Sequence, residues 1–309
     1  MTALPSTGIQ KSESLRIIKV RIVLFHLLCL GVFFVPVTPE LVFWTVVTFF
    51  IRVFAWEAGS HRYFAHRSFK TSRAFQLFLA VLAASGGQRG PIWWAEHHRH
   101  HHRHSDQPED PHSPVHKGYW FAHFGWLIDP RYIDTNLDNV KDLAKYPELV
   151  WVNKYHYLFP YLLLVTTYVI GEYTAVFGRE GLGVSALFWV FILSTVLSVQ
   201  STFSVNTLTH GHKSGLFNHR RFNTGDATTN NWFMCIPTMG ASWHNNHHRY
   251  MNSARAGFYW WQLDLTWLVL KALSWFGIVW DLHKVPEKVL AEGRNPQPGD
   301  ATTVSTEQA

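Results

Sequence analysis

The sequence predicts an all-α integral membrane protein, with four transmembrane helices in two hairpins and a cytoplasmic helical cap. Four apolar stretches occur in two closely spaced pairs, and polar, histidine-rich segments follow each pair. The 309 residues include 15 Trp and 23 Phe but only 16% charged residues, a balance typical of membrane proteins with interfacial aromatic belts. Because the mean hydropathy is nonetheless near zero, a substantial polar cap must balance the apolar spans.

The spans are predicted from the length of the apolar stretches. The first hairpin has spans at about 20–37 and 41–58, and the second has spans at about 160–177 and 184–205. A further apolar stretch at 74–84 is too short to cross a bilayer. We expect it to lie at the interface, which leaves the flanking histidines on one side of the membrane.

Basic residues set the predicted orientation. They concentrate in the flanks at 11–21, 62–73 and 213–221, whereas the loops inside the hairpins are poor in Lys and Arg. By the positive-inside rule both termini and all histidine-rich segments are therefore expected in the cytoplasm. Residues 1–19 are predicted to be a cytoplasmic N-terminal segment, and residues 286–309 a disordered C-terminal tail.

Charge and cysteine content exclude several classes of protein. The net charge of +6 suits a surface that faces anionic lipid headgroups or an anionic substrate headgroup. Nucleic acid is not expected as a partner, because the basic residues are scattered among apolar spans. Only Cys29 and Cys235 are present, which excludes a Cys-ligated iron–sulfur cluster and gives no support for a disulfide framework. The N-terminal region shows no cleavable signal pattern.

The tract WWAEHHRHHHRHSD at 93–106 holds six histidines within eight positions. On a helix, residues three and four apart share a face. His98, His101 and His102 satisfy this rule, but so do His97, His100 and His101, and the tract alone does not choose between the two registers. A loose, solvent-exposed His-rich tract is the alternative for an isolated run.

Further histidines make a metal site the stronger interpretation. His61 and His66 are five residues apart, which on an α-helix is about 140° of rotation, so the pair is expected to serve two neighbouring ions. With the first register of the tract, the candidates are His61, His66, His98, His101, His102, Asn206, His210, His244, His247 and His248. Nine histidines exceed the four ligands of a mononuclear structural site and indicate two metals. Nitrogen ligands favour iron, zinc, copper or nickel.

Three of these segments resemble the histidine boxes of integral-membrane fatty acyl desaturases of the Δ9, or stearoyl-CoA, type. The matching segments are HRYFAHRSF at 61–69, HRHHHRHSD at 98–106 and WHNNHHRYMNSARAG at 243–257, together with DPHSP at 110–114, GYWFAHFGWL at 118–127 and NTLTH at 206–210. The likeness covers about residues 20–285, which we interpret as one membrane desaturase domain. It also selects the register of His98, His101 and His102.

The resemblance implies a dinuclear iron centre that uses O2 to introduce a cis double bond, at the Δ9 position, into a saturated fatty acyl chain. Carried over by position, one iron is expected to take His61, His102, His210, His244 and His248. The other is expected to take His66, His98, His101 and His247, with a water held by Asn206. The implied acyl tunnel includes Gln88.

The resemblance also implies partners. Electrons must come from a separate ferredoxin or cytochrome b5-type donor, because the chain has no haem-binding His-Pro-Gly-Gly element and too few cysteines for a cluster. The acyl chain is expected to arrive linked to CoA, a carrier protein or a lipid. Its headgroup is expected to meet the basic residues Lys213, Arg220, Arg221, Arg249 and Arg255.

Two departures from the family pattern keep other functions open. Ala241 stands where the family commonly has Glu, and Glu57 stands where it is usually apolar or Thr. The same centre could therefore hydroxylate, or form an acetylenic or terminal unsaturation on a carrier-bound chain. A membrane metal-binding protein without enzyme activity is the third hypothesis, and the scarcity of polar groups in the spans weighs against a transporter.

Overall fold

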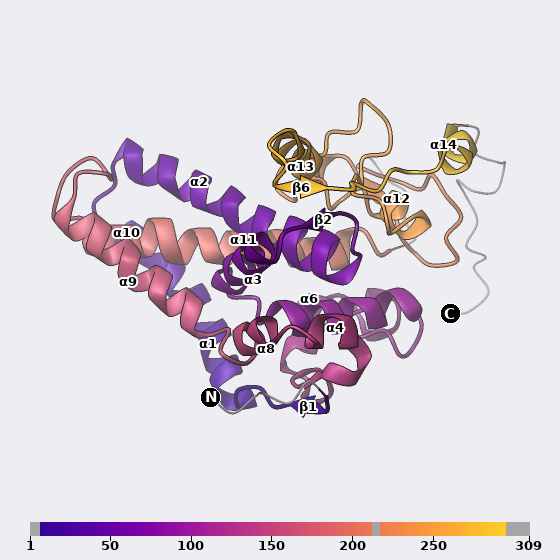
Figure 1. Ribbon diagram of the computed structural model, residues 1–309. Coiled ribbons are helices and arrows are strands. Elements are labelled where there is room, and N and C mark those ends of the chain that lie inside the picture. Colours follow the sequence, from indigo (N-terminus) through magenta and orange to yellow (C-terminus); the bar gives the residue numbers. More distant parts are fainter. Residues whose placement is uncertain (1–6, 212–216, 295–309) are drawn as a thin grey trace. The chain divides into compact units, whose positions relative to one another are not determined.

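The computed structural model describes residues 7–211 and 217–294, most of which form helices joined by loops (Figure 1). Within these ranges the strands form three antiparallel pairs of two residues each. The chain divides into two compact units. The first unit comprises residues 1–60, 76–96 and 127–201, and the second comprises residues 61–75, 97–126 and 202–309. The mostly helical architecture agrees with the predicted all-α class.

The first unit contains most of the long helices. Its elements are β1 (Ile9–Gln10), α1 (Leu15–Leu28), the 3-10 helix η1 (Cys29–Phe33), α2 (Pro39–Phe54), most of α3 (Arg73–Ser85), η4 (Pro130–Tyr132), β3 (Thr135–Asn136), η5 (Leu137–Val140), α7 (Lys141–Ala144), α8 (Pro147–Lys154), α9 (Leu158–Tyr173), α10 (Gly183–Ala186) and the π-helix η6 (Leu187–Leu193). Strands β1 and β3 pair with Ile9 opposite Asn136.

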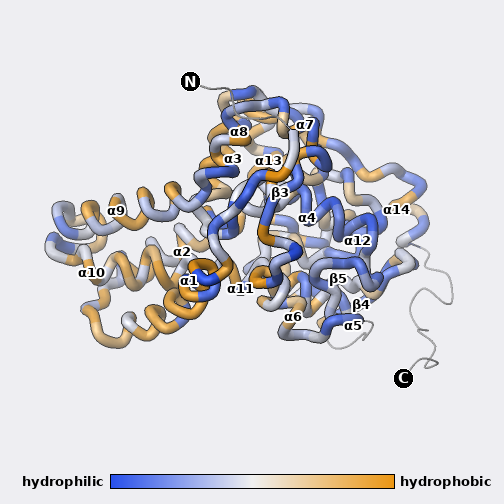
Figure 2. The backbone as a smooth tube through the Cα atoms, turned by 90° about the horizontal axis from the view of Figure 1, so that it is seen from below, coloured by the Kyte–Doolittle hydropathy of each residue, from blue (hydrophilic) through white to orange (hydrophobic). Residues whose placement is uncertain are grey.

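Local sequence explains where α2 begins and what it buries. The Thr38 hydroxyl accepts a hydrogen bond from the Leu41 amide at 3.1 Å, and Pro39 occupies the first turn, a favourable start for a helix. The core of this unit consists of Leu41, Phe177, Leu182, Ala186 and Val190. Figures 1 and 2 show α2, α9 and α10 as neighbouring, predominantly hydrophobic helices.

Gly171 allows α9 to approach α10 closely. A Cβ atom at this position would lie 2.8 Å from the Cβ of Ala186 and 3.0 Å from the carbonyl oxygen of Leu182. On their outer faces the helices of this unit expose apolar side chains such as Leu162 and Val165. A helix that is apolar on both its packed and its exposed faces is typical of a lipid-embedded segment.

Two helices are long and apolar enough to cross a membrane. Pro39–Ala65 joins α2 to the π-helix η2 (Ala55–Ala65), and Gly183–Leu208 joins α10, η6 and α11 (Ser194–Leu208). They correspond to two of the four predicted spans. In the other two, α1 has 14 residues and gives way to a 3-10 helix, and α9 has 16. Among the described residues, two predicted spans are therefore shorter than a full crossing.

The second unit carries the histidine-rich segments. It contains the C-terminal ends of η2, α4 (Pro91–Arg103) and α11, while η3 (Gly125–Ile128) lies at its boundary. Its other elements are β2 (Lys70–Thr71), α5 (Pro114–Lys117), α6 (Tyr119–His123), β4 (Asn218–His219), β5 (Asn230–Asn231), η7 (Phe233–Cys235), α12 (His244–Arg249), α13 (Leu265–Trp275), β6 (Val279–Trp280) and α14 (Glu287–Arg294). Strand β2 pairs with β6, and β4 pairs with β5.

A buried ion pair fixes the end of η2. Arg62 binds the carboxylate of Asp264 through two nitrogens at 3.0 Å each, and both side chains are buried. Asp264 also caps α13 by accepting a hydrogen bond from the Trp267 amide at 2.9 Å. The pair thus ties the chain next to His61 to the residue that caps α13.

The prediction of a disordered tail from residue 286 is wrong for its first part. Helix α14 spans Glu287–Arg294, and Val289 packs in a buried cluster with Phe222 and Phe258. A salt bridge joins Glu292 to Arg249. The many charged residues of this segment favoured a prediction of disorder, but its few apolar residues form one short face of an amphipathic helix. Residues 295–309 lie outside the described residues.

Candidate metal centre

All nine predicted histidines gather in the second unit, in two clusters. We call one the five-histidine cluster; it consists of His61, His66, His98, His102 and His247. We call the other the four-histidine cluster; it consists of His101, His210, His244 and His248. Within each cluster one ring nitrogen from every member lies within 4.8 Å of the others. The clusters are neighbours, since the rings of His102 and His248 are 4.4 Å apart.

The clusters divide the histidines differently from the sequence-based assignment. That assignment placed His61 and His102 with His210, whereas both belong to the five-histidine cluster; it placed His101 with His66, whereas His101 belongs to the four-histidine cluster. Part of the reason is local geometry. The His66 amide bonds to the carbonyl of His61 at 3.1 Å, and this π-helical pattern brings residues five apart onto one face. The two rings are only 4.9 Å apart, so both can reach one ion, which differs from the predicted division of the pair between two ions.

Helix α4 adopts the register selected by the family resemblance. His98 and His101 are buried and His102 is half-buried, and each belongs to one of the clusters. His100 and His104 are half-buried and pack against each other with ring centroids 4.6 Å apart. They belong to neither cluster.

Two asparagines fix the orientation of α12. Asn245 accepts hydrogen bonds from the backbone amides of residues 221 and 222 at 2.8 and 2.7 Å. Asn246 accepts one from the Nδ2 atom of Asn230 at 2.9 Å. Both asparagines are fully buried. The Asn-Asn pair of the third box is thus a structural clamp, which leaves the histidines on either side free to point into the clusters.

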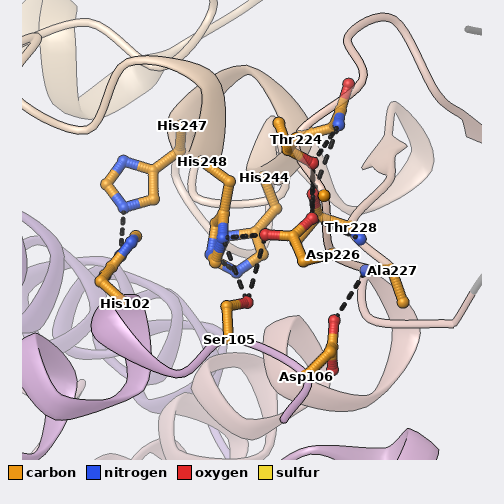
Figure 3. Close-up of polar contacts among 12 residues, drawn as sticks. His102, Ser105, Asp106, Thr224, Asp226, Ala227, Thr228, His244, His247 and His248 are labelled. Carbon is orange, nitrogen blue, oxygen red and sulfur yellow. Dashed lines mark hydrogen bonds and ion pairs between the residues drawn. The ribbon is translucent and has the colours of Figure 1, made fainter.

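Three carboxylates hold three of the four imidazoles in the four-histidine cluster. Figure 3 shows one of these pairs, Asp226 with His248. The Nδ1 atom of His101 donates to Asp110 at 2.9 Å, that of His210 to Asp106 at 3.0 Å, and that of His248 to Asp226 at 2.7 Å. An ionised carboxylate only accepts hydrogen bonds, so Nδ1 carries the proton in each ring. In the neutral ring, Nε2 then presents a lone pair. This carboxylate–histidine arrangement is typical of metal ligands.

Asp106 sits in a strained conformation that these contacts maintain. Its φ of 55° lies in the left-handed region, which costs a non-glycine residue roughly 1 kcal/mol or more. In return its carboxylate accepts hydrogen bonds from the Ser113 hydroxyl at 2.7 Å and the Ala227 amide at 2.8 Å. The strain places Asp106 where it can also bind His210.

In the four-histidine cluster, the Nε2 lone pairs that point inward outnumber the protons available to hydrogen-bond with them. His244 lies 2.8 Å from His210 and 3.1 Å from His248, measured between Nε2 atoms. It can donate a proton to one of them at most. The Nε2 atom of His101 is buried and has no hydrogen-bond partner among the described residues. A cation in the cluster would satisfy these converging acceptors.

The spacing of the nitrogens fits such a cation. In the five-histidine cluster, His98 lies 2.8 Å from His66 and 3.0 Å from His102, again between Nε2 atoms. Two nitrogen ligands at right angles around an ion with bonds of ~2.1 Å are about 3.0 Å apart. The donor set and its spacing therefore suit two transition-metal ions.

Burial keeps several of the clustered imidazoles neutral, as metal ligands must be. Desolvation, reinforced by repulsion from neighbouring imidazoles, lowers the pKa of His98, His102 and His247 well below the usual value. The pKa of His248 is lowered to about 4 by burial, against the opposing effect of Asp226. His210 is the exception, because Asp106 outweighs the effect of burial and raises its pKa.

The carboxylates, in contrast, stay ionised. Burial alone would raise the pKa of Asp226, but its interaction with His248 and the hydrogen bonds that its carboxylate accepts lower the pKa well below the usual range. The same balance, with His210 and His101 as the respective partners, lowers the pKa of Asp106 and Asp110. The site therefore combines neutral nitrogen donors with fixed negative charges behind them.

Sequence reasoning missed these three carboxylates. Asp106 and Asp110 lie inside the matched segments at 98–106 and 110–114, so each was within reach of a motif-based argument. Asp226 stands in the loop before β5, where no pattern marked it. His112 lies close to Asp110, which it contacts through its backbone amide at 3.0 Å, and stacks on His101 with centroids 4.3 Å apart.

The remaining predicted residues have varied positions. Asn206 is half-buried on α11, and His210 lies two residues beyond the end of that helix. Gln88 is half-buried in the turn after α3, in the first unit. Of the departures from the family pattern, Glu57 is fully buried in η2 and Ala241 is buried three residues before His244. The buried Nδ1 of His244 has no hydrogen-bond partner in the described part of the chain.

The arginines predicted to meet the substrate headgroup all have protein partners. Arg220 donates to the carbonyl of Thr228 at 3.2 Å, Arg221 to that of Gly293 at 2.6 Å, and Arg255 to that of Tyr259 at 2.7 Å. Arg249 binds Glu292. Lys213 lies outside the described residues. These contacts already use part of each guanidinium.

Comparison with known proteins places these observations in context. The sequence model of a family described as fatty acid desaturase matches residues 37–280, which include both clusters. The chain is 35% identical over 270 residues to an acyl-CoA 5-desaturase of Anemone leveillei, covering 85% of this chain and 78% of the relative. It is 33% identical over 232 residues to an sn-1 stearoyl-lipid 9-desaturase of Anabaena variabilis, covering 74% and 79%. It is also 33% identical over 252 residues to a hex-5-enoyl-acyl-carrier protein acetylenase of Moorena producens, covering 76% and 74%.

Proposed function

This chain belongs to the fatty acid desaturase family, and from that premise we propose that it introduces a cis double bond into a saturated fatty acyl chain. The observation that carries the proposal is the convergence of nine imidazoles in two adjacent clusters. The double bond is placed at Δ9, the position that the sequence resemblance favours. Relatives named for other positions, such as the 5-desaturase, make this the part of the proposal most in need of product analysis.

The proposed reaction removes one hydrogen from each of two adjacent methylene groups. The atoms balance when O2, two electrons and two protons are consumed and two molecules of water leave with the unsaturated chain. Two bound irons would supply the activation of O2 and the oxidising power for this step. They would be held by the five-histidine and the four-histidine clusters, with Asn206 holding a water ligand of one of them.

The residues of this chain prepare the site for that chemistry. Asp106, Asp110 and Asp226 keep Nδ1 protonated in their partner imidazoles and direct Nε2 inward. Burial excludes water from the clusters, which limits loss of the oxidant to side reactions. Neutral imidazoles do not neutralise the positive charge of the metals. The carboxylates of Asp106, Asp110 and Asp226, which bond to the far side of these rings, balance part of that charge.

We further propose a four-span topology with both termini and the clusters in the cytoplasm. The two long apolar helices and the distribution of basic residues support it. In this topology α1 and α9 complete the crossings with their flanking residues. Gln88 is assigned to the acyl tunnel, and residues 20–285 form the desaturase domain.

The electron donor is proposed to be a separate ferredoxin or cytochrome b5-type protein that docks on the basic cytoplasmic surface. The headgroup of the acyl carrier would contact the basic residues near 213–221 and 249–255. The names of the relatives include acyl-CoA, acyl-lipid and acyl-carrier substrates. Each of these three carriers is therefore a substrate to supply to the purified enzyme.

Expression in a host that lacks the double bond, with a ferredoxin or cytochrome b5 donor, is expected to yield a new cis-monounsaturated fatty acid. Gas chromatography with mass spectrometry of derivatised acyl chains gives the bond position. The His98→Ala variant is the matched control, because it lacks a ligand of the five-histidine cluster. Purified enzyme supplied with acyl-CoA, acyl-carrier protein or phospholipid then identifies the carrier. Unchanged lipids from an iron-loaded protein with a working donor would contradict the proposal.

One relative and one departure from the family sequence pattern favour a second reaction at the same metal centre. The acetylenase of Moorena producens is as similar as several desaturases, and Ala241 removes a carboxylate that the family commonly has. Formation of a triple bond or of a hydroxyl group on a carrier-bound chain would follow from altered positioning of the substrate. Label from 18O2 in the acyl product would indicate the hydroxylase, and an acyl chain with two fewer hydrogens per bond formed would indicate desaturation or acetylenation.

A further inference from the structure

We propose that the four-histidine cluster binds its metal ion first and more tightly than the five-histidine cluster, with Asp226 as the main positioning residue. The inference rests on the proposed function only in that both clusters bind metal. It concerns the order of loading, which neither the family resemblance nor the names of the relatives address.

The first argument is pre-organisation. Three of the four imidazoles in the four-histidine cluster are held by carboxylates through Nδ1. Their ring orientation and tautomer are therefore set before any ion arrives. Metal binding therefore removes little further conformational freedom from these side chains. The loss of that freedom costs roughly 0.5–1.5 kcal/mol of binding free energy per flexible side chain.

Asp226 is itself the most firmly held of these carboxylates (Figure 3). It accepts hydrogen bonds from the hydroxyls of Thr224 and Thr228, at 2.5 Å each, and from the Thr228 amide at 3.1 Å. The Ser105 hydroxyl, just beyond α4, adds a further hydrogen bond at 3.1 Å. Asp226 thus ties His248 to both the loop before β5 and the end of α4.

The five-histidine cluster lacks comparable support at three of its members. In the described part of the chain, the rings of His66, His102 and His247 form hydrogen bonds only with other rings of the same cluster. Ring-to-ring contacts also occur in the four-histidine cluster, where His244 meets His210 and His248. There, however, carboxylates already fix the tautomers of three rings. In the five-histidine cluster an ion must itself fix the tautomers of these three rings as it binds.

Electrostatics favours the same order. Three carboxylates lie behind the four-histidine cluster and attract a first divalent cation to it. Once that cation is bound, it repels a second one from the adjacent five-histidine cluster, because the rings of His102 and His248 are only 4.4 Å apart. Pre-organisation and charge therefore both predict two loading steps of unequal affinity.

Anaerobic titration of the metal-free, full-length protein in detergent with Co2+ tests the inference, because the ligand-field absorption of Co2+ reports each site. The wild type is expected to show two steps. Asp226→Asn is expected to weaken the first step by 10–100-fold, since an amide no longer enforces the protonated Nδ1 of His248. His66→Ala is expected to remove the second step and leave the first. Asp281→Asn is the matched control, because Asp281 is exposed and forms its salt bridge with Lys70, away from both clusters.

A milder variant covers the case in which Asp226→Asn does not fold. Ser105→Ala removes one hydrogen bond to Asp226 and is expected to weaken the first step by roughly twofold to tenfold. A single cooperative step of two ions, or a weakened second step with the first unchanged in either variant, would overturn the inference. The titration requires neither O2 nor an acyl chain. Two unequal steps in a protein that modifies no acyl chain would therefore refute the proposed function while leaving the loading order intact.

Discussion

Replacing His101 with alanine is expected to reduce bound iron from two ions to about one per chain and to abolish the modification of acyl chains. The side chain of His101 is almost fully buried, its Nδ1 is held by Asp110, and its Nε2 has no other partner among the described residues. Alanine leaves the four-histidine cluster with three donors. Loss of an outer partner of a ligand alone typically costs 10–100-fold in affinity or activity, so loss of the ligand itself should cost more.

His104→Ala provides the matched comparison on the same helix. His104 is half-buried, packs against His100 and belongs to neither cluster. The His104→Ala variant is expected to retain two irons and near-normal activity. Iron is measured by mass spectrometry of purified protein, activity by product analysis, and folding by size-exclusion elution. Equal losses in both variants, or a fully loaded and active His101→Ala protein, would contradict the assignment.

The metal-free protein is expected to lose stability steeply as the pH falls below about 6.5. Burial, reinforced by neighbouring imidazoles, depresses the pKa of His98, His102, His244 and His247 in the folded state. The unfolded chain takes up protons on these residues first, so acid favours unfolding. Each proton of difference changes the free energy of unfolding by about 1.4 kcal/mol per pH unit. The effect accumulates over several imidazoles.

Two other groups shape this pH dependence without reversing it. His210 has a raised pKa in the folded state, so it opposes the loss between its unfolded and folded values. The depressed pKa values of Asp106, Asp110 and Asp226 provide stability above about pH 4, which is lost only in stronger acid. The window from pH 7.5 to 5.5 therefore separates the imidazoles from the carboxylates, and within it the several depressed imidazoles outweigh the opposing effect of His210.

Thermal unfolding followed by tryptophan fluorescence measures this dependence in protein stripped with a chelator. The unfolding temperature is expected to fall progressively from pH 7.5 to 5.5, and His98→Gln should make the fall shallower because it removes one buried titrating ring. A flat profile across this window would mean that the clustered imidazoles do not remain neutral in the folded protein.

The sequence was most informative where spacing on a helix determines which side chains converge. The i, i+3, i+4 pattern of His98, His101 and His102 and of His244, His247 and His248 placed each set on one face, and the structure brings both sets together. The choice of register in the tract needed the family resemblance, because two registers satisfy the same rule. The structure brings the selected set into the two clusters and leaves His100 and His104 outside them.

The division into clusters could not be predicted from α-helical geometry. The π-helix η2 turns His61 and His66 onto one face, and nothing in HRYFAH distinguishes π-helical from α-helical hydrogen bonding. Asp226 was out of reach for a different reason. Its contact with His248 joins positions 22 residues apart through a loop, so no periodicity connects them. Hydropathy likewise gave no sign of the 3-10 helix η1, which shortens the α-helix in the first predicted span.

The positions of the bound metals test the central claim most directly. Anomalous diffraction or cryo-electron microscopy of the iron-loaded protein is expected to show two iron peaks, one within the five-histidine cluster and one within the four-histidine cluster. The group formed by His101, Asp110 and His112 could also hold an ion, but it would have to displace the hydrogen bond that orients His101. A single peak in that group, or no peak in either cluster, would contradict the account.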